Sequence, residues 1–298
     1  MEELRAKSEN LEKKNEELRA KSEELRAKTE NLEKKNEELR AKSENLEKKN
    51  EELRAKSENL EKKNEELRAK SENLEKKNEE LRAKSENLEK KNEELRAKSD
   101  ILELLCVQRD KVDVTLDADT AHPRLQVSED GKSVTDTGVI RKVPNKDERF
   151  DSHTFLLAKE GYRSGRLYWE VDVGKKRNWN LGVAQETVRR KETVALSPKN
   201  GFWVIGLADG QEYWALSDPW TRLMVSGRPQ KIGIFLDISS KKLSFFSVHQ
   251  KKLLYTFTFV NPHSRNVKLF PFFSTGSAAT SSDTEPLRIA GGFDDDDK

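Results

Sequence analysis

Residues 164–184 read SGRLYWEVDVGKKRNWNLGVA, and this stretch decides the fold. Its first half alternates between two kinds of side chain, as a β-strand with two different faces requires. One face carries Leu167, Trp169, Val171 and Val173, and the other carries Tyr168, Glu170 and Asp172. A face with a Trp and three aliphatic residues requires a second apolar layer on top of it. The stretch therefore predicts the centre of a two-sheet β domain.

The composition of the chain changes abruptly near residue 105. The segment before it contains no Gly, no Pro and no aromatic residue, so all 14 Gly, all 8 Pro and all 21 aromatic residues follow it. About 180 residues remain for a globular part, which is enough for one domain with a sizeable core. The two segments therefore need separate interpretations.

The first segment alternates two heptads, EELRAKS and ENLEKKN, and places a leucine at every seventh residue from Leu4 to Leu102, fifteen times in all. Acidic and basic residues four apart, such as Glu3 and Lys7, add favourable pairs along a helix. The pattern predicts one continuous helix over residues 1–107. Its apolar end, residues 101–107, is expected to pack onto the domain, with Cys106 as a buried small hydrophobe.

Whether this helix pairs with a second copy is left open by the pattern. With Leu at heptad position d, position a always holds Ser, Asn or Thr, which limits stability. In a parallel pair Lys7 faces Glu12 favourably, whereas Lys14 faces Arg19 unfavourably. An antiparallel pair would set rows of Lys against each other. Two interpretations remain: a weak parallel homo-oligomer, or an isolated charged helix that acts as a spacer.

Charge and cysteine content narrow the class of protein. The net charge of +2 gives no electrostatic case for nucleic acid or for an anionic membrane. A single cysteine excludes an internal disulfide and fits a reducing compartment. No apolar run approaches the roughly 20 residues of a membrane helix. We expect a cytoplasmic chain with no nucleic-acid partner and no membrane contact, or the cytosolic part of a membrane-anchored parent.

Three ordered signatures resemble the B30.2 family, in which a PRY segment precedes an SPRY segment. They are LDADTAHPRLQVSEDGKSV at 116–134, the stretch at 164–184, and GIFLDIS at 233–239. Ala118 stands where the family usually has Pro. The third signature is usually Leu-Asp-Tyr-Glu, and only its first two positions are matched here, by Leu236 and Asp237. The resemblance implies an antiparallel two-sheet β-sandwich over 108–290, after the helical rod of 1–107. Residues 291–298, which end in Asp-Asp-Asp-Asp-Lys, are expected to be a disordered or appended tail.

The spacing of turn residues predicts the strands of this sandwich. They are expected at 112–117, 124–127, 167–173, 179–183, 201–207, 212–216, 231–237, 242–248, 253–259, 269–273 and 287–289.

The family resemblance implies a non-catalytic protein-recognition module, with a role in immune recognition or signalling. Two alternatives stay open: a sensor of phosphorylated small ligands of the butyrophilin type, and the substrate-binding part of a ubiquitin ligase whose RING is absent here. The residues agree with a binding role, since no phosphate loop, nucleophile elbow or metal-ligand spacing occurs. Glu170 and Asp172 are expected on an exposed strand face. We therefore expect no enzymatic activity, no cofactor and no metal.

Two candidate binding surfaces emerge from the sequence. Trp169 and Trp203 alternate with aliphatic residues and belong in the core, whereas Trp214 ends a strand and Trp220 lies in a loop, a common place for an interface anchor. The candidate partner-binding residues are Trp214, Trp220, Arg177, Asn178, Asn180, Gly206, Ala208, Asp209 and Ser277. The antibody-binding member of the tripartite-motif family carries Trp in the segment that matches residues 206–208, so antibody binding is not expected here.

The second candidate surface is basic. Lys175, Lys176, Arg177, Arg189, Arg190 and Lys191 flank residues 179–184, and by convergence they could bind phosphate or an acidic peptide. The alternative is a solvated basic rim. Phosphate-sensing butyrophilins carry a His in the GRHYW signature; Leu167 takes that position here, which removes one donor.

Overall fold

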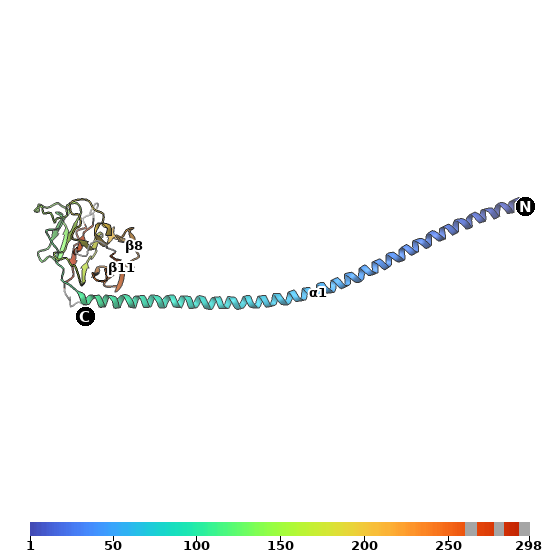
Figure 1. Ribbon diagram of the computed structural model, residues 1–298, viewed down its shortest axis with the longest axis horizontal. Helices are drawn as coiled ribbons and strands as arrows, with labels where there is room; N and C mark the ends of the chain where they lie inside the picture. The colour runs from blue at the N-terminus through green and yellow to red at the C-terminus, as the bar shows by residue number, and fades with distance from the viewer. Residues whose placement is uncertain (260–266, 277–282, 292–298) are drawn as a thin grey trace. The chain divides into compact units, whose positions relative to one another are not determined.

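The computed structural model describes residues 1–259, 267–276 and 283–291 of the chain. Helix α1 (Glu2–Val107) runs without interruption for 106 residues, coloured blue to green in Figure 1. No Gly or Pro interrupts its backbone hydrogen bonds, which explains its length. The chain divides into two compact units, Met1–Leu88 and Glu89–Lys298. The last turns of α1 thus lie in the same compact unit as the β domain.

The β domain consists of short strands joined by turns. After the 3-10 turn η1 (Gln108–Asp110), the described residues form β1 (Leu125–Val127), β2 (Ser133–Asp136), β3 (Phe155–Leu157), β4 (Arg166–Asp172), β5 (Trp179–Gln185), η2 (Pro198–Asn200), β6 (Phe202–Ala208), β7 (Glu212–Ala215), β8 (Thr221–Leu223), β9 (Lys231–Asp237), β10 (Lys242–Ser247), β11 (Lys252–Thr258), β12 (Leu269–Ser274) and β13 (Leu287–Ile289).

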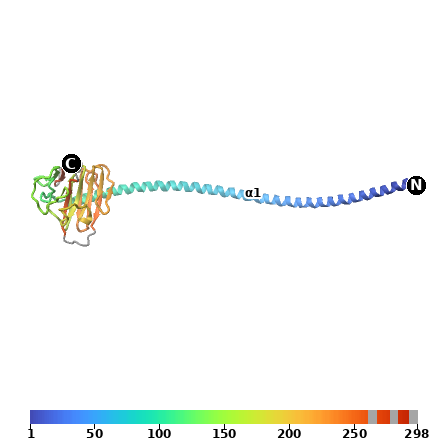
Figure 2. The same ribbon diagram turned by 90° about the horizontal axis from the view of Figure 1, so that it is seen from above.

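These strands form two antiparallel sheets, as the sequence predicted. One sheet has seven strands in the order β1-β2-β13-β4-β9-β10-β11, and the other has six in the order β3-β12-β5-β6-β7-β8. Figure 2 shows β10 and β11, in orange, side by side at one edge. The main core lies between the sheets and includes the inward residues of β4, with Trp169 fully buried. The predicted tail beyond residue 291 lies outside the described residues.

The prediction of a strand at 112–117 was wrong. Within this segment only Leu116 forms a bridge, with Ala158, and Lys111 just before it forms a bridge with Tyr168. Tyr168 belongs to the seven-stranded sheet, whereas Ala158 follows β3 of the six-stranded sheet. The segment therefore crosses from one sheet to the other and cannot form a continuous ladder with either.

The outer face of β4 also differs from the prediction, because Glu170 is buried rather than exposed. The end of α1 covers it: Leu104 and Val107 pack against Tyr168, Phe235 and Phe246. This contact confirms that the apolar end of the helix packs onto the domain. Leu104 and Val107 lie on one side of the helix, and Cys106 lies off that side, so Cys106 is exposed and its predicted burial was wrong.

A hydrogen-bonded cluster of polar side chains lies on this outer face of β4. The Tyr168 hydroxyl donates to Glu170 Oε1 at 2.7 Å, and Gln108 Nε2 donates to that oxygen at 3.2 Å. Burial, together with the charge of Glu170, raises the pKa of Tyr168, so the hydroxyl stays protonated and keeps donating. Gly233 of the neighbouring β9 makes room for it, since a Cβ there would lie 2.4 Å from the hydroxyl oxygen.

We predict that Leu104→Ala destabilises the β domain by about 2–4 kcal/mol, because it leaves a cavity over Tyr168 and Phe246. Leu105→Ala is the matched control, since Leu105 is 51% exposed and Leu104 only 2%. The free energy of unfolding is measured in urea by tryptophan fluorescence of the full chain. Equal losses in the two variants would show that the helix end does not stabilise the domain.

Candidate functional site

A pocket of about 580 Å³ opens on the outer face of the six-stranded sheet. Its floor is a row of four residues that lie opposite one another on adjacent strands: Ser274 of β12, Asn180 of β5, Gly206 of β6 and Trp214 of β7. Beside the pocket, the same sheet face is filled by an apolar cluster that includes Phe155, Leu196, Phe202 and Phe272. The pocket is therefore the part of this face that the chain's own side chains leave uncovered.

The pocket has an aromatic wall and a polar wall. Its lining residues are His122, Arg124, Ser152, His153, Thr154, Phe155, Asn178, Asn180, Thr193, Val194, Ala195, Leu196, Gly206, Leu207, Ala208, Trp214, Leu216, Trp220, Ser274 and Gly276.

Gly206 keeps the floor of the pocket low. A Cβ at this position would lie 2.1 Å from Asn180 Oδ1 and 3.0 Å from the carbonyl oxygen of Trp179. The side chain of Asn180 therefore occupies the space that a Cβ at Gly206 would take, and no larger residue fits without moving it. Glycine at this position is what lets the Asn180 side chain lie over the neighbouring strand β6.

The aromatic wall consists of Trp214 and Trp220. Their ring centroids are 6.4 Å apart and their planes are inclined by 53°. Trp214 is half-buried, whereas 58% of Trp220 is exposed. An exposed tryptophan at the edge of an apolar recess is the kind of residue that anchors a partner side chain.

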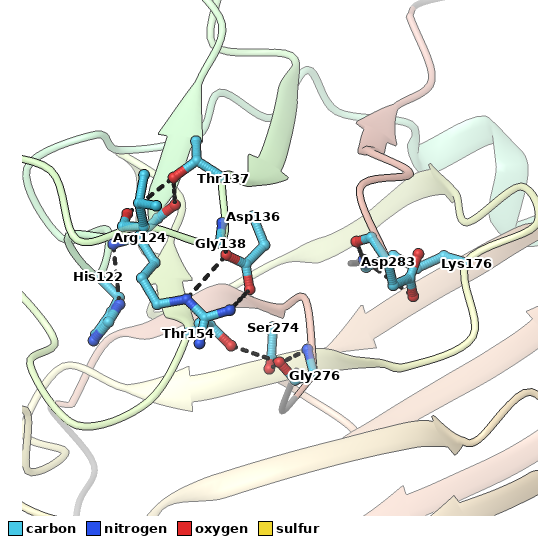
Figure 3. Close-up of polar contacts among 11 residues, drawn as sticks. His122, Arg124, Asp136, Thr137, Gly138, Thr154, Lys176, Ser274, Gly276 and Asp283 are labelled. Atoms are coloured by element: carbon cyan, nitrogen blue, oxygen red, sulfur yellow. Dashed lines mark hydrogen bonds and ion pairs between the residues drawn. The ribbon is translucent and has the colours of Figure 1, made fainter. Parts of the chain in front are cut away.

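The polar wall comes from residues early in the domain (Figure 3). Arg124 donates to both carboxylate oxygens of Asp136, at 3.1 and 2.9 Å. The Arg124 backbone N–H donates to His122 Nδ1 at 3.2 Å, and His122 Nε2 lies 3.1 Å from the Asp151 carbonyl oxygen. Burial lowers the pKa of His122, against the effect of that carbonyl. The neutral ring with its proton on Nε2 satisfies both contacts.

His153 is the second imidazole of the pocket. Its ring stacks on Phe155 at 4.9 Å, and its Nε2 is buried without a hydrogen-bond partner among the described residues. Sequence reasoning selected neither His122 nor His153, because nothing local to either histidine shows that it lies beside residues 178–214.

The structure brings most of the predicted partner-binding residues together. Trp214, Trp220, Asn178, Asn180, Gly206 and Ala208 line the pocket. Arg177 and Asp209 lie next to it: Arg177 Nη2 donates to the Asp209 carbonyl at 3.3 Å, and the Asp209 N–H donates to Asn178 Oδ1 at 3.0 Å. Ser277 lies outside the described residues. Their use in binding remains a proposal.

The predicted basic surface does not form a comparable site. Lys176 is buried and its Nζ lies 3.4 Å from the carboxylate of Asp283, as the right of Figure 3 shows. The same carboxylate accepts the backbone N–H groups of Arg177 and Asn178, at 2.8 and 3.2 Å. Burial lowers the pKa of Lys176, and the charge of Asp283 opposes this effect. Lys176 thus holds the turn before β5 in place.

The other three basic residues lie beyond the opposite end of β5 and have their own partners. Arg190 donates to the carbonyl oxygens of Glu148 and Glu186, and Lys191 donates to that of Lys146. Arg189 pairs with Glu192 at 3.4 Å. Strand β5, seven residues long, separates this group from Lys175, Lys176 and Arg177. This arrangement favours a basic rim over a converged phosphate site.

We predict that Asp283→Asn destabilises the domain by about 3 kcal/mol, because it leaves the ammonium group of Lys176 buried without its counter-charge. Adding Lys176→Met should restore most of the loss, since the buried charge is then gone. Urea unfolding of the single and double variants measures both. No cost for Asp283→Asn, or no rescue by Lys176→Met, would contradict this role of the pair.

Two family models match the chain. The SPRY-associated domain matches residues 114–162, and the SPRY domain matches residues 166–286. Together they span more than half of the 298 residues. The chain belongs to the B30.2 family. The B30.2 domain thus covers both sheets, the pocket and the segment that crosses between the sheets.

Relatives of this chain include a butyrophilin, an E3 ubiquitin-protein ligase and pyrin. Human butyrophilin subfamily 1 member A1 is 44% identical over 181 residues, which are 60% of this chain and 32% of that protein. Mouse E3 ubiquitin-protein ligase TRIM58 is 41% identical over 61% of this chain and 35% of its own length. Human pyrin is 40% identical over 63% and 24%. The chain spans about a third or less of the length of these relatives.

Solved structures support the fold of the B30.2 domain. The TRIM65 PSpry domain aligns over 62% of this chain and 93% of its own, with a TM-score of 0.52 and 22% identity. Stonustoxin aligns with the same TM-score and 24% identity, over 61% of this chain and 29% of its own. Both resemblances show the fold alone, because so little sequence is shared. The matched family and its relatives make the domain a protein-interaction module.

Among the described residues, no helix is both long and apolar enough to span a bilayer. No group of three or more His, Cys, Asp or Glu side chains there is arranged to hold a metal ion.

Proposed function

We propose that this chain is a non-catalytic recognition protein whose B30.2 domain holds a segment of a protein partner in the pocket on the six-stranded sheet. The row of Ser274, Asn180, Gly206 and Trp214 under Trp220 carries the proposal, because it leaves an open floor between one apolar and one polar wall. The proposed setting is cytoplasmic, either as an independent chain or as the cytosolic part of a membrane-anchored parent, in immune recognition or signalling.

The two walls suit the two parts of a peptide. An apolar side chain can enter between Trp214 and Trp220, where its burial supplies most of the affinity. The amide of Asn180 and the free nitrogen of His153 can then bond to the backbone of the same segment. Pockets with apolar walls and a few directed polar groups bind ligands in this way. A substrate-binding part of a ubiquitin ligase, as the name of the TRIM58 relative suggests, would use the same pocket.

We predict that Trp220→Ala weakens partner binding by about 2 kcal/mol, roughly thirtyfold, because it removes one side of the aromatic wall. Met224→Ala is the matched control, since Met224 is an 89% exposed apolar residue outside the pocket lining. The full chain and both variants capture proteins from cell lysate, and mass spectrometry quantifies each protein retained. Proteins held by the native chain and by Met224→Ala, but lost with Trp220→Ala, are the expected result.

Equal capture by all three chains would contradict a partner site in this pocket. Trp220 is largely exposed, so its loss should leave the thermal unfolding temperature nearly unchanged. A thermal scan of each variant checks this condition.

We also propose that α1 pairs in parallel with a second copy of the chain. Every leucine of the heptad stripe from Leu4 to Leu102 is exposed, between 54% and 75% in the single chain. A parallel pair would bury this stripe. The parallel direction is preferred because it sets Lys7 opposite Glu12, whereas an antiparallel pair sets rows of Lys against each other. Two B30.2 domains on one rod would raise the apparent affinity for a multivalent partner without new contacts.

We predict that the native chain has the mass of a dimer in size-exclusion chromatography with light scattering at high micromolar concentration. The triple variant Leu53→Lys, Leu60→Lys, Leu67→Lys should be a monomer, because it breaks the stripe. The triple variant Ala41→Lys, Ala55→Lys, Ala69→Lys changes residues off the stripe and should stay a dimer. A native monomer would leave the isolated helical spacer as the correct interpretation, and dissociation in both variants would contradict pairing through the leucine stripe.

A further inference from the structure

Strand β11, labelled in Figure 1, is an edge strand of the seven-stranded sheet and pairs with β10 alone among the described residues. Tyr255 lies opposite Phe245, Phe257 lies opposite Leu243, and the Phe259 N–H donates to the Lys241 carbonyl. In an antiparallel ladder the direction of the backbone groups alternates along the strand. The N–H and C=O groups of Thr256 and Thr258 therefore point away from β10.

The start of β11 is not available for pairing with an added strand. The Leu253 N–H donates to the Asp100 carboxylate of α1 at 3.3 Å, and the register shifts between Phe245 and Phe246 of β10, which leaves Leu254 as the extra residue of a bulge. The free part of the edge is thus 254–258.

A cleft of about 570 Å³ runs beside this free edge. Tyr255, Thr256, Phe257 and Thr258 line one side, and Gln185, Pro198, Lys199, Trp203, Ser217 and Asp218 line the other. It shares no lining residue with the pocket on the six-stranded sheet. An extended segment added to β11 would turn every second side chain into the cleft, toward Tyr255 and Trp203.

The charges around the cleft select the occupant. Lys251 and Lys252 stand at one end of β11, and Lys241 and Lys242 stand beside the other, where Lys242 lies opposite Thr258. All four are exposed, as is Lys199 in the cleft, and the described residues provide an ion-pair partner for none of the five. A second copy of this edge would set lysines against lysines in an antiparallel pair, which like charges oppose. Asp218 in the cleft and Asp237, which lies opposite Lys242 on β9, carry negative charge, but an acidic segment still meets exposed lysines at both ends of β11.

We propose that the β11 edge is a second docking site of the B30.2 domain, which takes an extended peptide with acidic ends and alternating apolar residues by strand addition. The site is independent of the pocket proposed above. It combines free backbone groups, an adjacent cleft with aromatic residues, and a basic rim at both ends.

The first test uses defined peptides and the full chain. A fluorescein-labelled peptide Glu-Glu-Val-Thr-Val-Thr-Val-Glu-Glu should bind saturably by fluorescence anisotropy at a Kd below about 1 mM. The same peptide with Lys in place of every Glu should bind at least tenfold more weakly. Hydrogen–deuterium exchange with the acidic peptide should slow within residues 252–258. No binding of the acidic peptide, equal binding of both peptides, or slowed exchange only elsewhere would overturn the proposal.

The second test removes one backbone donor. Thr258→Pro lacks the N–H that points away from β10, so the ladder to β10 keeps its hydrogen bonds, and acidic-peptide affinity should fall at least tenfold. Thr258→Ala keeps the donor and should bind within twofold of the native chain. Trp220→Ala should also bind normally, which separates this site from the pocket. Unchanged affinity in Thr258→Pro, loss in Trp220→Ala, or a dimer sensitive to Thr258→Pro would each overturn strand addition by an acidic peptide.

If Thr258→Pro fails to fold, as circular dichroism would show, the exchange protection of residues 252–258 in the native chain decides the question by itself.

Discussion

Both faces of β4 are buried, and each face is covered by a different element. Trp169 and its neighbours on one face meet the six-stranded sheet, while Tyr168 and Glu170 on the other lie under the end of α1. A central strand with two covered faces must satisfy its polar groups internally, since water does not reach them. The bonds from Tyr168 and Gln108 meet this requirement for Glu170, whereas Trp169 Nε1 is buried without a hydrogen-bond partner among the described residues. The last turns of the helix are thereby part of the domain.

The position of the pocket follows from how the six-stranded sheet is covered. An apolar cluster fills one part of its outer face, and the row through Asn180 and Gly206 lines the pocket beside it. The turn before β5 brings Asn178 to the edge of this row, and the Asp283 carboxylate holds that turn through two backbone N–H groups and Lys176. The buried lysine thus contributes to the shape of the site rather than to its charge.

The two proposed docking regions differ in their physical basis. The pocket relies on the burial of an apolar side chain between Trp214 and Trp220, with few polar groups to orient it. The β11 edge relies on backbone hydrogen bonds and on lysines at both ends of the strand. The first is selective for side-chain shape, and the second for an extended backbone and negative charge. One domain could therefore hold two segments of a partner at once.

The sequence by itself determined the elements whose signal is local. The alternation around Trp169 predicted the central strand and the two-sheet sandwich, and the seven-residue leucine repeat predicted the uninterrupted helix. Trp214 and Trp220 were selected because of their places at a strand end and in a loop. Strands β2, β3 and β8, of three or four residues each, were not predicted from the sequence.

Only the tertiary structure decided which distant residues meet. It placed His122 and His153 beside residues 178–214, buried Glu170 under the helix, paired Lys176 with Asp283, and kept Arg190 at the far end of β5 from Lys175. The physical reason is that strand periodicity and turn chemistry act over a few residues. The register between strands and the covering of each sheet face depend on contacts across the whole chain.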